Sequence, residues 1–324
     1  MNRSTEVARD TSVRPGRDLT LPGSSPRPGR YYHLRNNYPT WFAGGALLLY
    51  GAFVLLPSLV GLGYSFTDWS AYSTDLHWVG LANFATIFQP NSEYVGAIVN
   101  TVIFTIATII LKTVIALALA VLLTSGVRRL SYLYRALIYL PALLPMVAVG
   151  IVFKSILDPD VGLLNSTLRL VGLGGLAQQW LTNVSLALWS VIGVDTWKGV
   201  GYIMVILMAG LLAIPRDYYE AAKIDGASGW QAFRYITLPL LRPVLAVTTV
   251  LNLLYALRVF DIVYVLTNGG PGYATDTVYI AIFNAFSLGQ WGVATALSTV
   301  FFIVMIALGF VVLRVMRRPE VAYT

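Results

Sequence analysis

The sequence PRDYYEAAKIDGASGWQAFRYITLP, residues 215–239, is a polar stretch that separates two long apolar runs, 186–213 and 244–267. A helix needs about 20 apolar residues to cross a hydrocarbon core of about 30 Å, and both runs are long enough. Four other runs meet the same requirement, at residues 41–66, 97–124, 133–156 and 291–315. Backbone polar groups in lipid must be satisfied within each segment, so the sequence predicts an all-α membrane protein with six transmembrane helices.

Composition leads to the same class. Of the 324 residues, 57% are hydrophobic and only 11% are charged, whereas a soluble domain carries about 25% charged residues. The mean hydropathy is +0.70. A soluble enzyme is therefore excluded, and so is disorder over most of the chain.

The polar stretch 215–239 carries two helix-start signals of the capping-box type. These pairs are Asp217 with Glu220 and Ser228 with Gln231. Gly226 predicts the end of the first helix, because glycine adopts the left-handed cap conformation, and Pro239 predicts the end of the second. We therefore expect two short helices joined at a glycine turn.

The apolar residues of these two helices form a stripe rather than a ring. They are Tyr218, Ala221, Ala222, Ile224, Phe233 and Ile236. The stripe could insert into a groove on another protein, or it could pack back on the membrane domain. The residues alone leave both possibilities open.

The same stretch resembles the EAA loop of binding-protein-dependent ABC importer permeases. The matching positions are Glu220, Ala221, Ala222, Asp225, Gly226, Ile236, Leu238 and Pro239. The resemblance implies a type I ABC importer permease fold in which residues 214–243 couple to a cytoplasmic ATPase. Glu220 would contact a cleft of that ATPase, and Gly226 would permit the turn.

Further motifs over residues 41–318 resemble the carbohydrate-uptake subgroup, and among its members the maltose-type first permease without its extra N-terminal spans. They are Tyr64-Ser65-Phe66-Thr67-Asp68-Trp69, Gly80-Leu81-x-Asn83-Phe84, Asn100-Thr101 and Phe260-Asp261-x-x-Tyr264-Val265-Leu266-Thr267-x-Gly269-Gly270-Pro271. The resemblance implies a sugar substrate. Glycerol-3-phosphate or another anion remains the alternative, with Lys198 and Arg258 as counter-charges.

Polar residues inside membrane spans are functional candidates because they are costly to bury there. Eight of them define a predicted substrate pathway, namely Asp195, Lys198, Gly199, Tyr202, Asn252, Tyr255, Arg258 and Asp261. By resemblance, Gly199 and Tyr202 correspond to positions of the sugar site in maltose-type permeases. The spacing favours the pairs Asp195–Lys198 and Arg258–Asp261, which could contact substrate or simply hold the bundle together.

Other intramembrane residues receive simpler interpretations. Lys112 in the second run could bond to backbone carbonyls or reach a cavity, and the sequence offers no partner for it. Lys154 is expected to extend its amine toward the membrane surface. Pro57, Pro141 and Pro145 can kink their helices.

The distribution of basic residues predicts the topology. With the N-terminus inside, the cytoplasmic segments 1–40, 125–136, 214–243 and 314–324 hold 7, 3, 4 and 3 basic residues, which is 17 of the 22. This positive-inside bias places both termini in the cytoplasm. The resemblance implies that the membrane is the bacterial plasma membrane. The outer loops are acidic, with Asp68, Asp75, Glu93, Asp158, Asp160 and Asp276. They could dock an external partner or merely keep the loops solvated.

Three domains are expected. They are a disordered basic tail at 1–40, a permease domain at 41–318 and a short tail at 319–324. The first segment holds seven arginines and five prolines, a composition that cannot bury enough apolar surface to fold.

The chain lacks a phosphate-binding loop of the Gly-x-x-x-x-Gly-Lys-Ser/Thr type. We therefore expect no enzyme activity and no cofactor in this chain, with ATP and Mg²⁺ bound by partner subunits. The expected partners are a second permease, two ATPase subunits, an extracytoplasmic solute-binding protein and a sugar, without nucleic acid. The other class considered is a self-contained ion-coupled secondary transporter, for which no inverted repeat is visible.

Cysteine and metal chemistry are not expected. The chain contains no cysteine and two histidines, His33 and His77, which lie far apart. Disulfides and thiolate metal sites are therefore excluded, and a histidine-based metal site is disfavoured.

Overall fold

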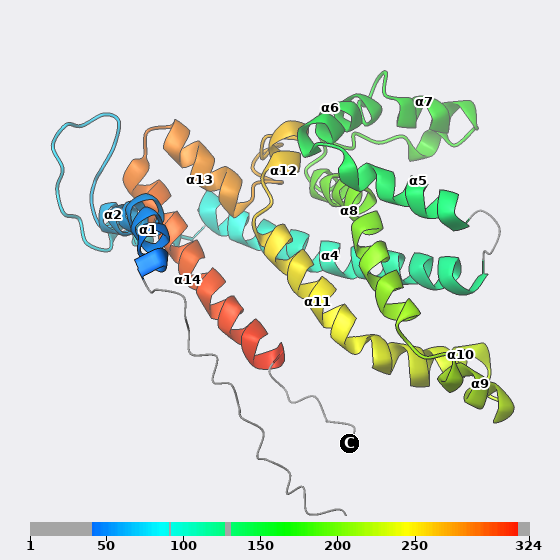
Figure 1. The fold of residues 1–324 in the computed structure, drawn as a ribbon. Helices are drawn as coiled ribbons and strands as arrows, with labels where there is room; N and C mark the ends of the chain where they lie inside the picture. The colour runs from blue at the N-terminus through cyan, green and yellow to red at the C-terminus, as the bar shows by residue number, and fades with distance from the viewer. Residues whose placement is uncertain (1–40, 91, 127–130, 317–324) are drawn as a thin grey trace, which may run out of the picture. The chain divides into compact units, whose positions relative to one another are not determined.

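The computed structural model describes residues 41–90, 92–126 and 131–316, and within these ranges the chain is helical (Figure 1). The chain divides into two compact units between Leu55 and Leu56. The expected tails at 1–40 and 319–324 lie outside the described residues. In the first unit, helix α1 (Trp41–Tyr50) continues into a π-helical turn, η1 (Gly51–Leu55).

The centre of the second unit is formed by three long helices, α4 (Glu93–Val121), α8 (Ala187–Leu212) and α11 (Leu238–Leu257). Helix α8 packs against both others and is the most buried span. Glycines allow this close packing. A Cβ at Gly210 would lie 2.8 Å from Leu241 on α11, and one at Gly201 would overlap the backbone carbonyl of Ile138, which belongs to the third span.

The remaining helices of this unit surround the centre. Helix α14 (Trp291–Met316) packs against α2 (Leu56–Tyr64), α3 (Ala82–Ile87) and α13 (Val278–Ser287). Five helices of the described residues are long and apolar enough to cross a membrane, and a sixth crossing results if the bent pair α5 and α6 counts as one span. The six-span prediction is confirmed in that form.

The third span is not the single helix expected over 133–156. It is broken into α5 (Ser131–Leu143) and α6 (Met146–Ile156), which meet at 98°. Pro141 lies inside α5, and Pro145 precedes α6 as its N-cap. Proline removes a helical hydrogen bond and disfavours helical geometry in the residue before it, so two prolines four residues apart turn the expected kink into a break.

The fifth span begins and ends earlier than the expected 244–267. A continuous apolar helix runs over Gly229–Leu257 and includes α10 (Gly229–Ala232), the π-helical turn η4 (Phe233–Thr237) and α11. The chain then leaves the helix at Arg258 and restarts at α12 (Asp261–Leu266). Pro239 therefore does not end the second short helix, since the π-turn immediately before it accommodates the missing N–H.

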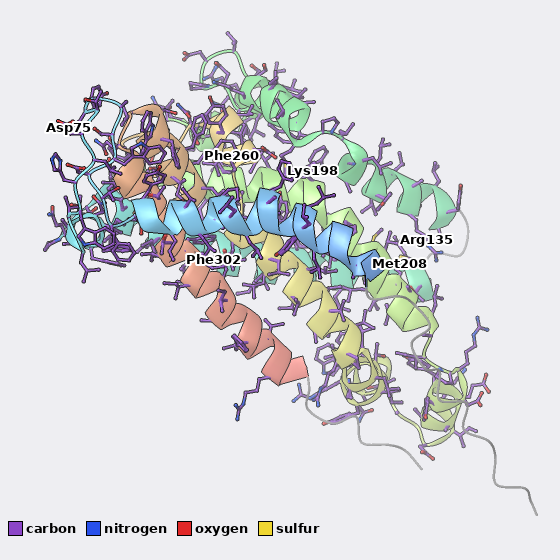
Figure 2. All side chains as sticks on the ribbon, turned by 60° about the vertical axis from the view of Figure 1, so that its left-hand side comes forward. Asp75, Arg135, Lys198, Met208, Phe260 and Phe302 are labelled. Atoms are coloured by element: carbon purple, nitrogen blue, oxygen red, sulfur yellow. The ribbon has the colours of Figure 1, made fainter. Side chains whose placement is uncertain are left out.

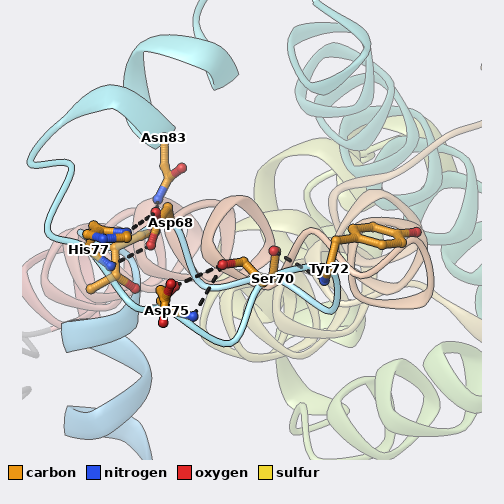
Figure 3. Close-up of polar contacts among 8 residues, drawn as sticks. Asp68, Ser70, Tyr72, Asp75, His77 and Asn83 are labelled. Carbon is orange, nitrogen blue, oxygen red and sulfur yellow. Dashed lines mark hydrogen bonds and ion pairs between the residues drawn. The ribbon is translucent and has the colours of Figure 1, made fainter.

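Short polar networks shape the loops at the end of the bundle opposite α9 (Asp217–Ile224). Figure 3 shows the loop before α3, where Asp68 accepts a hydrogen bond from the His77 backbone and the Asn83 amide approaches the same turn. Asn83 donates to the carbonyls of Ser65 and Thr67 at 2.9 and 2.8 Å. In the loop after α6, Asn165 joins α7 (Leu163–Leu170) to the segment that follows η3 (Gly174–Leu176), because it accepts from the Trp180 indole at 2.8 Å.

Candidate functional site

A cavity of about 350 Å³ opens between α4, α8, α11 and the break of the third span. Six of the eight predicted pathway residues line it, namely Asp195, Lys198, Gly199, Tyr202, Asn252 and Tyr255. The other lining residues are Lys112, Tyr139, Ala142, Met146, Ile203 and Leu251. Side chains from four separate spans thus meet at one mainly apolar space inside the bundle, with charged and amide groups on part of its wall.

A charged network forms one wall of the cavity. The Lys112 amine on α4 lies 2.6 Å from Asp195 Oδ2 on α8, and the two side chains are 3% and 1% exposed. The Tyr255 hydroxyl on α11 donates to Asp195 Oδ1 at 2.8 Å. The same amine lies 4.6 Å from the centre of the Tyr255 ring, within cation–π range. Three helices are therefore joined through one buried carboxylate.

The predicted pair Asp195–Lys198 is wrong. Asp195 is paired with Lys112, while the Lys198 amine donates to the Ala142 carbonyl at 3.4 Å. That carbonyl lies in the last turn of α5, where the break leaves it without a helical partner and a cation is favourable. Figure 2 shows Lys198 between Phe260 and Met208 along the bundle.

The predicted pair Arg258–Asp261 does not form either. Arg258 ends α11 and donates to the Tyr279 hydroxyl at 3.4 Å, whereas Asp261 begins α12 and is exposed. The prediction of this pair from a three-residue spacing holds only if both residues lie on one continuous helix. The helix is broken between them, so the two side chains do not share a helix face. Neither residue lines the cavity.

The uncharged pathway residues have distinct environments. Asn252 is 4% exposed and donates to the Thr108 carbonyl on α4 at 3.5 Å. Tyr202 is 45% exposed, so its ring is available to a ligand. Gly199 provides room for the network, because a Cβ there would lie 2.8 Å from Lys112 Cε.

Lys112 reaches the cavity, which was one of its two expected environments, but sequence reasoning did not find its partner. Its partner lies on a different helix, and spacing along the chain reveals only partners on the same helix. The available signal was the isolated cation itself, since a buried charge requires a counter-charge. Asp195 and Asp261 were the acidic residues within other apolar runs.

The polar stretch forms a helical hairpin, as expected, with Gly226 at φ +76° between α9 and α10. The second capping box is present, with Ser228 and Gln231 bonded reciprocally. The first is not, because Arg216 occupies the N-cap of α9 and Asp217 is already its first residue. Acidic residues in that first turn still complement the positive end of the helix.

Four of the eight predicted coupling residues lie on the surface of this hairpin. Glu220, Ala221, Asp225 and Gly226 are exposed, and Ala222, Ile236, Leu238 and Pro239 are half-buried. From the apolar stripe, Tyr218 is 52% and Ile224 86% exposed, so these two do not pack back on the described part of the chain. The Tyr219 hydroxyl lies 3.0 Å from Thr237 Oγ1, which attaches α9 to the start of the fifth span.

No metal centre was found within the described ranges, where no group of three or more His, Cys, Asp or Glu side chains could hold an ion.

The comparisons with known proteins agree on one family. A sequence model of the family described as binding-protein-dependent transport system inner membrane component matches residues 112–319. The trehalose/maltose transport system permease protein MalF of Thermococcus litoralis is 34% identical over 265 residues, which cover 82% of this chain and 88% of that protein. The lactose transport system permease protein LacF of Rhizobium radiobacter is 35% identical, covering 79% of this chain and 84% of that protein.

A solved structure shares the fold. In the crystal structure of a bacterial ABC transporter that imports the acidic polysaccharide alginate, one chain superposes with a TM-score of 0.72 at 25% identity. The match covers 86% of this chain and 96% of that one. The chain belongs to the family of binding-protein-dependent transport system inner membrane components, and its fold is that of a type I ABC importer permease.

Proposed function

We propose that this chain is one of two permease subunits of a sugar importer, and that the cavity around Asp195 is its part of the sugar pathway. The observation that carries the proposal is this cavity, since six residues chosen from the sequence meet there with Lys112. The sugar-transport names of the relatives in Thermococcus litoralis and Rhizobium radiobacter support the substrate class.

The cavity has the chemistry that a saccharide requires. Sugar hydroxyls need donors and acceptors in fixed positions, and the apolar face of a sugar ring stacks on aromatic side chains. Asp195, Asn252 and the Tyr255 hydroxyl supply the polar groups, and the half-exposed Tyr202 ring supplies a flat apolar surface. A small number of placed polar groups in a mainly apolar pocket is typical of small-molecule sites.

The energy would come from ATP hydrolysed, with Mg²⁺, in two partner ATPase subunits. The exposed surface of α9, with Glu220 and Ile224, would seat in those subunits. Movement of α9 reaches the cavity through two connections, namely the Tyr219–Thr237 contact and the continuous helix Gly229–Leu257, which carries Asn252 and Tyr255. Because one helix joins the hairpin to the pathway, closure of the ATPases can switch the side to which the cavity opens.

The proposed orientation places α9 and both termini on the cytoplasmic side of a plasma membrane. The positive-inside bias of the sequence supports this orientation. A solute-binding protein would then deliver the sugar at the opposite end of the bundle, and a second permease would complete the pathway.

Co-purification tests the assembly. The tagged chain is extracted in mild detergent, and the proteins recovered with it are identified by mass spectrometry. We expect an ATPase and a second permease, with the ATPase lost in the Glu220→Ala and Gly226→Val variants. Recovery of the chain alone, together with solute movement in vesicles without ATP, would overturn the proposal.

One observation favours an anionic solute as a second candidate. Lys198 lines the cavity without a carboxylate partner among the described residues, whereas the charge of Lys112 is neutralised by Asp195. Lys198→Gln would then reduce uptake of an acidic saccharide or glycerol-3-phosphate and leave a neutral disaccharide unaffected. Arg258, the other cation considered for this role, lies outside the cavity.

A further inference from the structure

A buried carboxylate lies at the end of the bundle opposite α9 and has no counter-charge among the described residues. Asp276, just before α13, is 2% exposed, and its Oδ1 atom has no hydrogen-bond partner within the described structure. Burial, with the nearby charge of Glu93, raises the pKa of Asp276 to about 7. Glycine makes the burial possible, since a Cβ at Gly269 would lie 2.5 Å from that oxygen.

Glu93, the first residue of α4, faces the same space. A hollow of about 200 Å³ is lined by both carboxylates together with Tyr94 and Tyr273. A wider hollow of about 570 Å³ shares Glu93 and the two tyrosines. Because the two hollows share these three lining residues, we call them together the outer acidic pocket. It therefore has two carboxylates and two aromatic rings on its walls.

No cation of the described residues neutralises this pocket. Their two ion pairs are Lys112–Asp195 and His77–Asp68, and both lie elsewhere. Two carboxylates are too few for a calcium site, which takes 6–8 oxygen ligands. A guanidinium or ammonium group fits better, because it pairs with one or two carboxylates and is attracted to the faces of tyrosine rings.

The pocket is held open by hydrogen bonds from motif residues. Asn100 on α4 donates to the Tyr273 carbonyl at 3.1 Å, and Thr101 accepts from the Val278 backbone at 2.9 Å. Thr277 donates to the Val259 carbonyl at 3.2 Å. The first two bonds fix the loop against α4, and none of the three uses the carboxylate of Glu93 or Asp276.

We propose that the outer acidic pocket receives one arginine or lysine side chain of the solute-binding protein that serves this permease. The inference rests on the proposed function, because it requires a binding protein that docks at this end. A basic side chain is inferred because its charge complements the two carboxylates. A solute-binding protein is inferred as the partner because the chain belongs to a binding-protein-dependent family. Docking would stabilise the ionised form of Asp276.

The test measures docking of the binding protein to the complete transporter in lipid nanodiscs at pH 8. Hydrogen bonds to charged groups contribute about 1.5–3 kcal/mol, so Glu93→Gln and Asp276→Asn should each weaken the Kd by about 10-fold to 150-fold. Glu93 is exposed, so its substitution leaves folding intact. Asp75→Asn, in an exposed loop at the same end, is the matched control and should leave the Kd unchanged. Wild-type affinity in the Glu93 and Asp276 variants would overturn the inference.

A charge exchange identifies the partner residue. Glu93→Arg should abolish docking, and a single Arg→Glu or Lys→Glu substitution in the binding protein should restore it. Failure of every basic position to rescue docking would reject a single-side-chain contact.

The outcome also separates this inference from the proposed function. If the wild-type complex binds no solute-binding protein, the proposed function fails. If it binds one and Glu93→Gln binds equally well, only the inference about the pocket fails. The Gly226→Val variant should dock normally while transport is lost, because its defect lies at the other end of the bundle.

Discussion

Lys112 on α4 and Asp195 on α8 form an ion pair of 2.6 Å inside the membrane-spanning bundle, with almost no exposure of either side chain. The Tyr255 hydroxyl bonds the same carboxylate from α11. An ion pair in this position stabilises the bundle only while both partners are present, because a lone buried charge has no solvent to screen it.

Removing one partner of this pair should therefore cost more than removing both. We expect Lys112→Met or Asp195→Leu to lower the free energy of unfolding by about 3–5 kcal/mol. The double variant should recover much of that loss yet remain inactive in uptake. Thermal unfolding in detergent and a double-mutant cycle measure this. Lys154→Met, an exposed cation of α6, is the control. Additive single effects would contradict the pairing.

Three glycines of α8 should respond differently to alanine. A Cβ at Gly199 would lie 2.8 Å from Lys112 Cε, so Gly199→Ala should displace the lysine and reduce uptake more than it reduces stability. Gly201→Ala overlaps the Ile138 backbone and should destabilise the protein by about 1–3 kcal/mol. Gly193→Ala meets open space and should be neutral. Expression level, melting temperature and uptake of the three variants test this prediction. Equal effects of the three substitutions would refute the different roles of the three glycines.

The turn between α9 and α10 depends on a left-handed glycine. Gly226 has φ +76° and open space around it, so Gly226→Val should cost about 1–2 kcal/mol through backbone strain alone. Gly229→Ala, which also meets open space but has no positive φ, is the matched control. Protease sensitivity of the hairpin reports the local effect. Equal sensitivity of both variants would show that the left-handed conformation is not required.

The contact between Tyr219 and Thr237 should transmit movement rather than maintain the fold. Tyr219→Phe removes one hydrogen bond of 3.0 Å, worth about 0.5–1.5 kcal/mol. We expect ATPase association to persist while the number of sugar molecules imported per ATP falls. Tyr218→Phe, one residue earlier on the exposed face, is the control. An unchanged transport ratio would exclude this route.

Asp276 should make stability depend on pH. Its folded-state pKa of about 7 lies above the ordinary value of 3.8, so the folded protein holds this proton more tightly than the unfolded chain does. The resulting stabilisation is complete below about pH 4 and is lost as the pH rises through 7. Asp276→Asn should therefore raise the melting temperature more at pH 8 than at pH 5. Glu93 and Tyr94 on α4 and Tyr273 in the loop are the titratable neighbours. An equal gain at both pH values would disprove the linkage.

Patterns along the chain were sufficient to predict several features of this protein. Apolar run length predicted the spans, because a helix in lipid must satisfy its own backbone and reach across a core of known thickness. The capping box at Ser228 and the glycine at position 226 predicted the hairpin, because both act within a few residues. The polar residues within the apolar runs included six of the residues that line the cavity. A polar side chain is costly to bury in lipid, so its presence there indicates a function.

Only the tertiary structure decided how those residues are paired and where the helices break. Asp195 was expected to bind Lys198, three residues along the same helix, but binds Lys112 on another span, and Arg258 and Asp261 are separated by a helix end. The physical reason is the same in each case. Spacing along one helix fixes which residues share a face, whereas the partner of a buried charge is set by which helices pack together, and that depends on contacts between residues distant in the sequence.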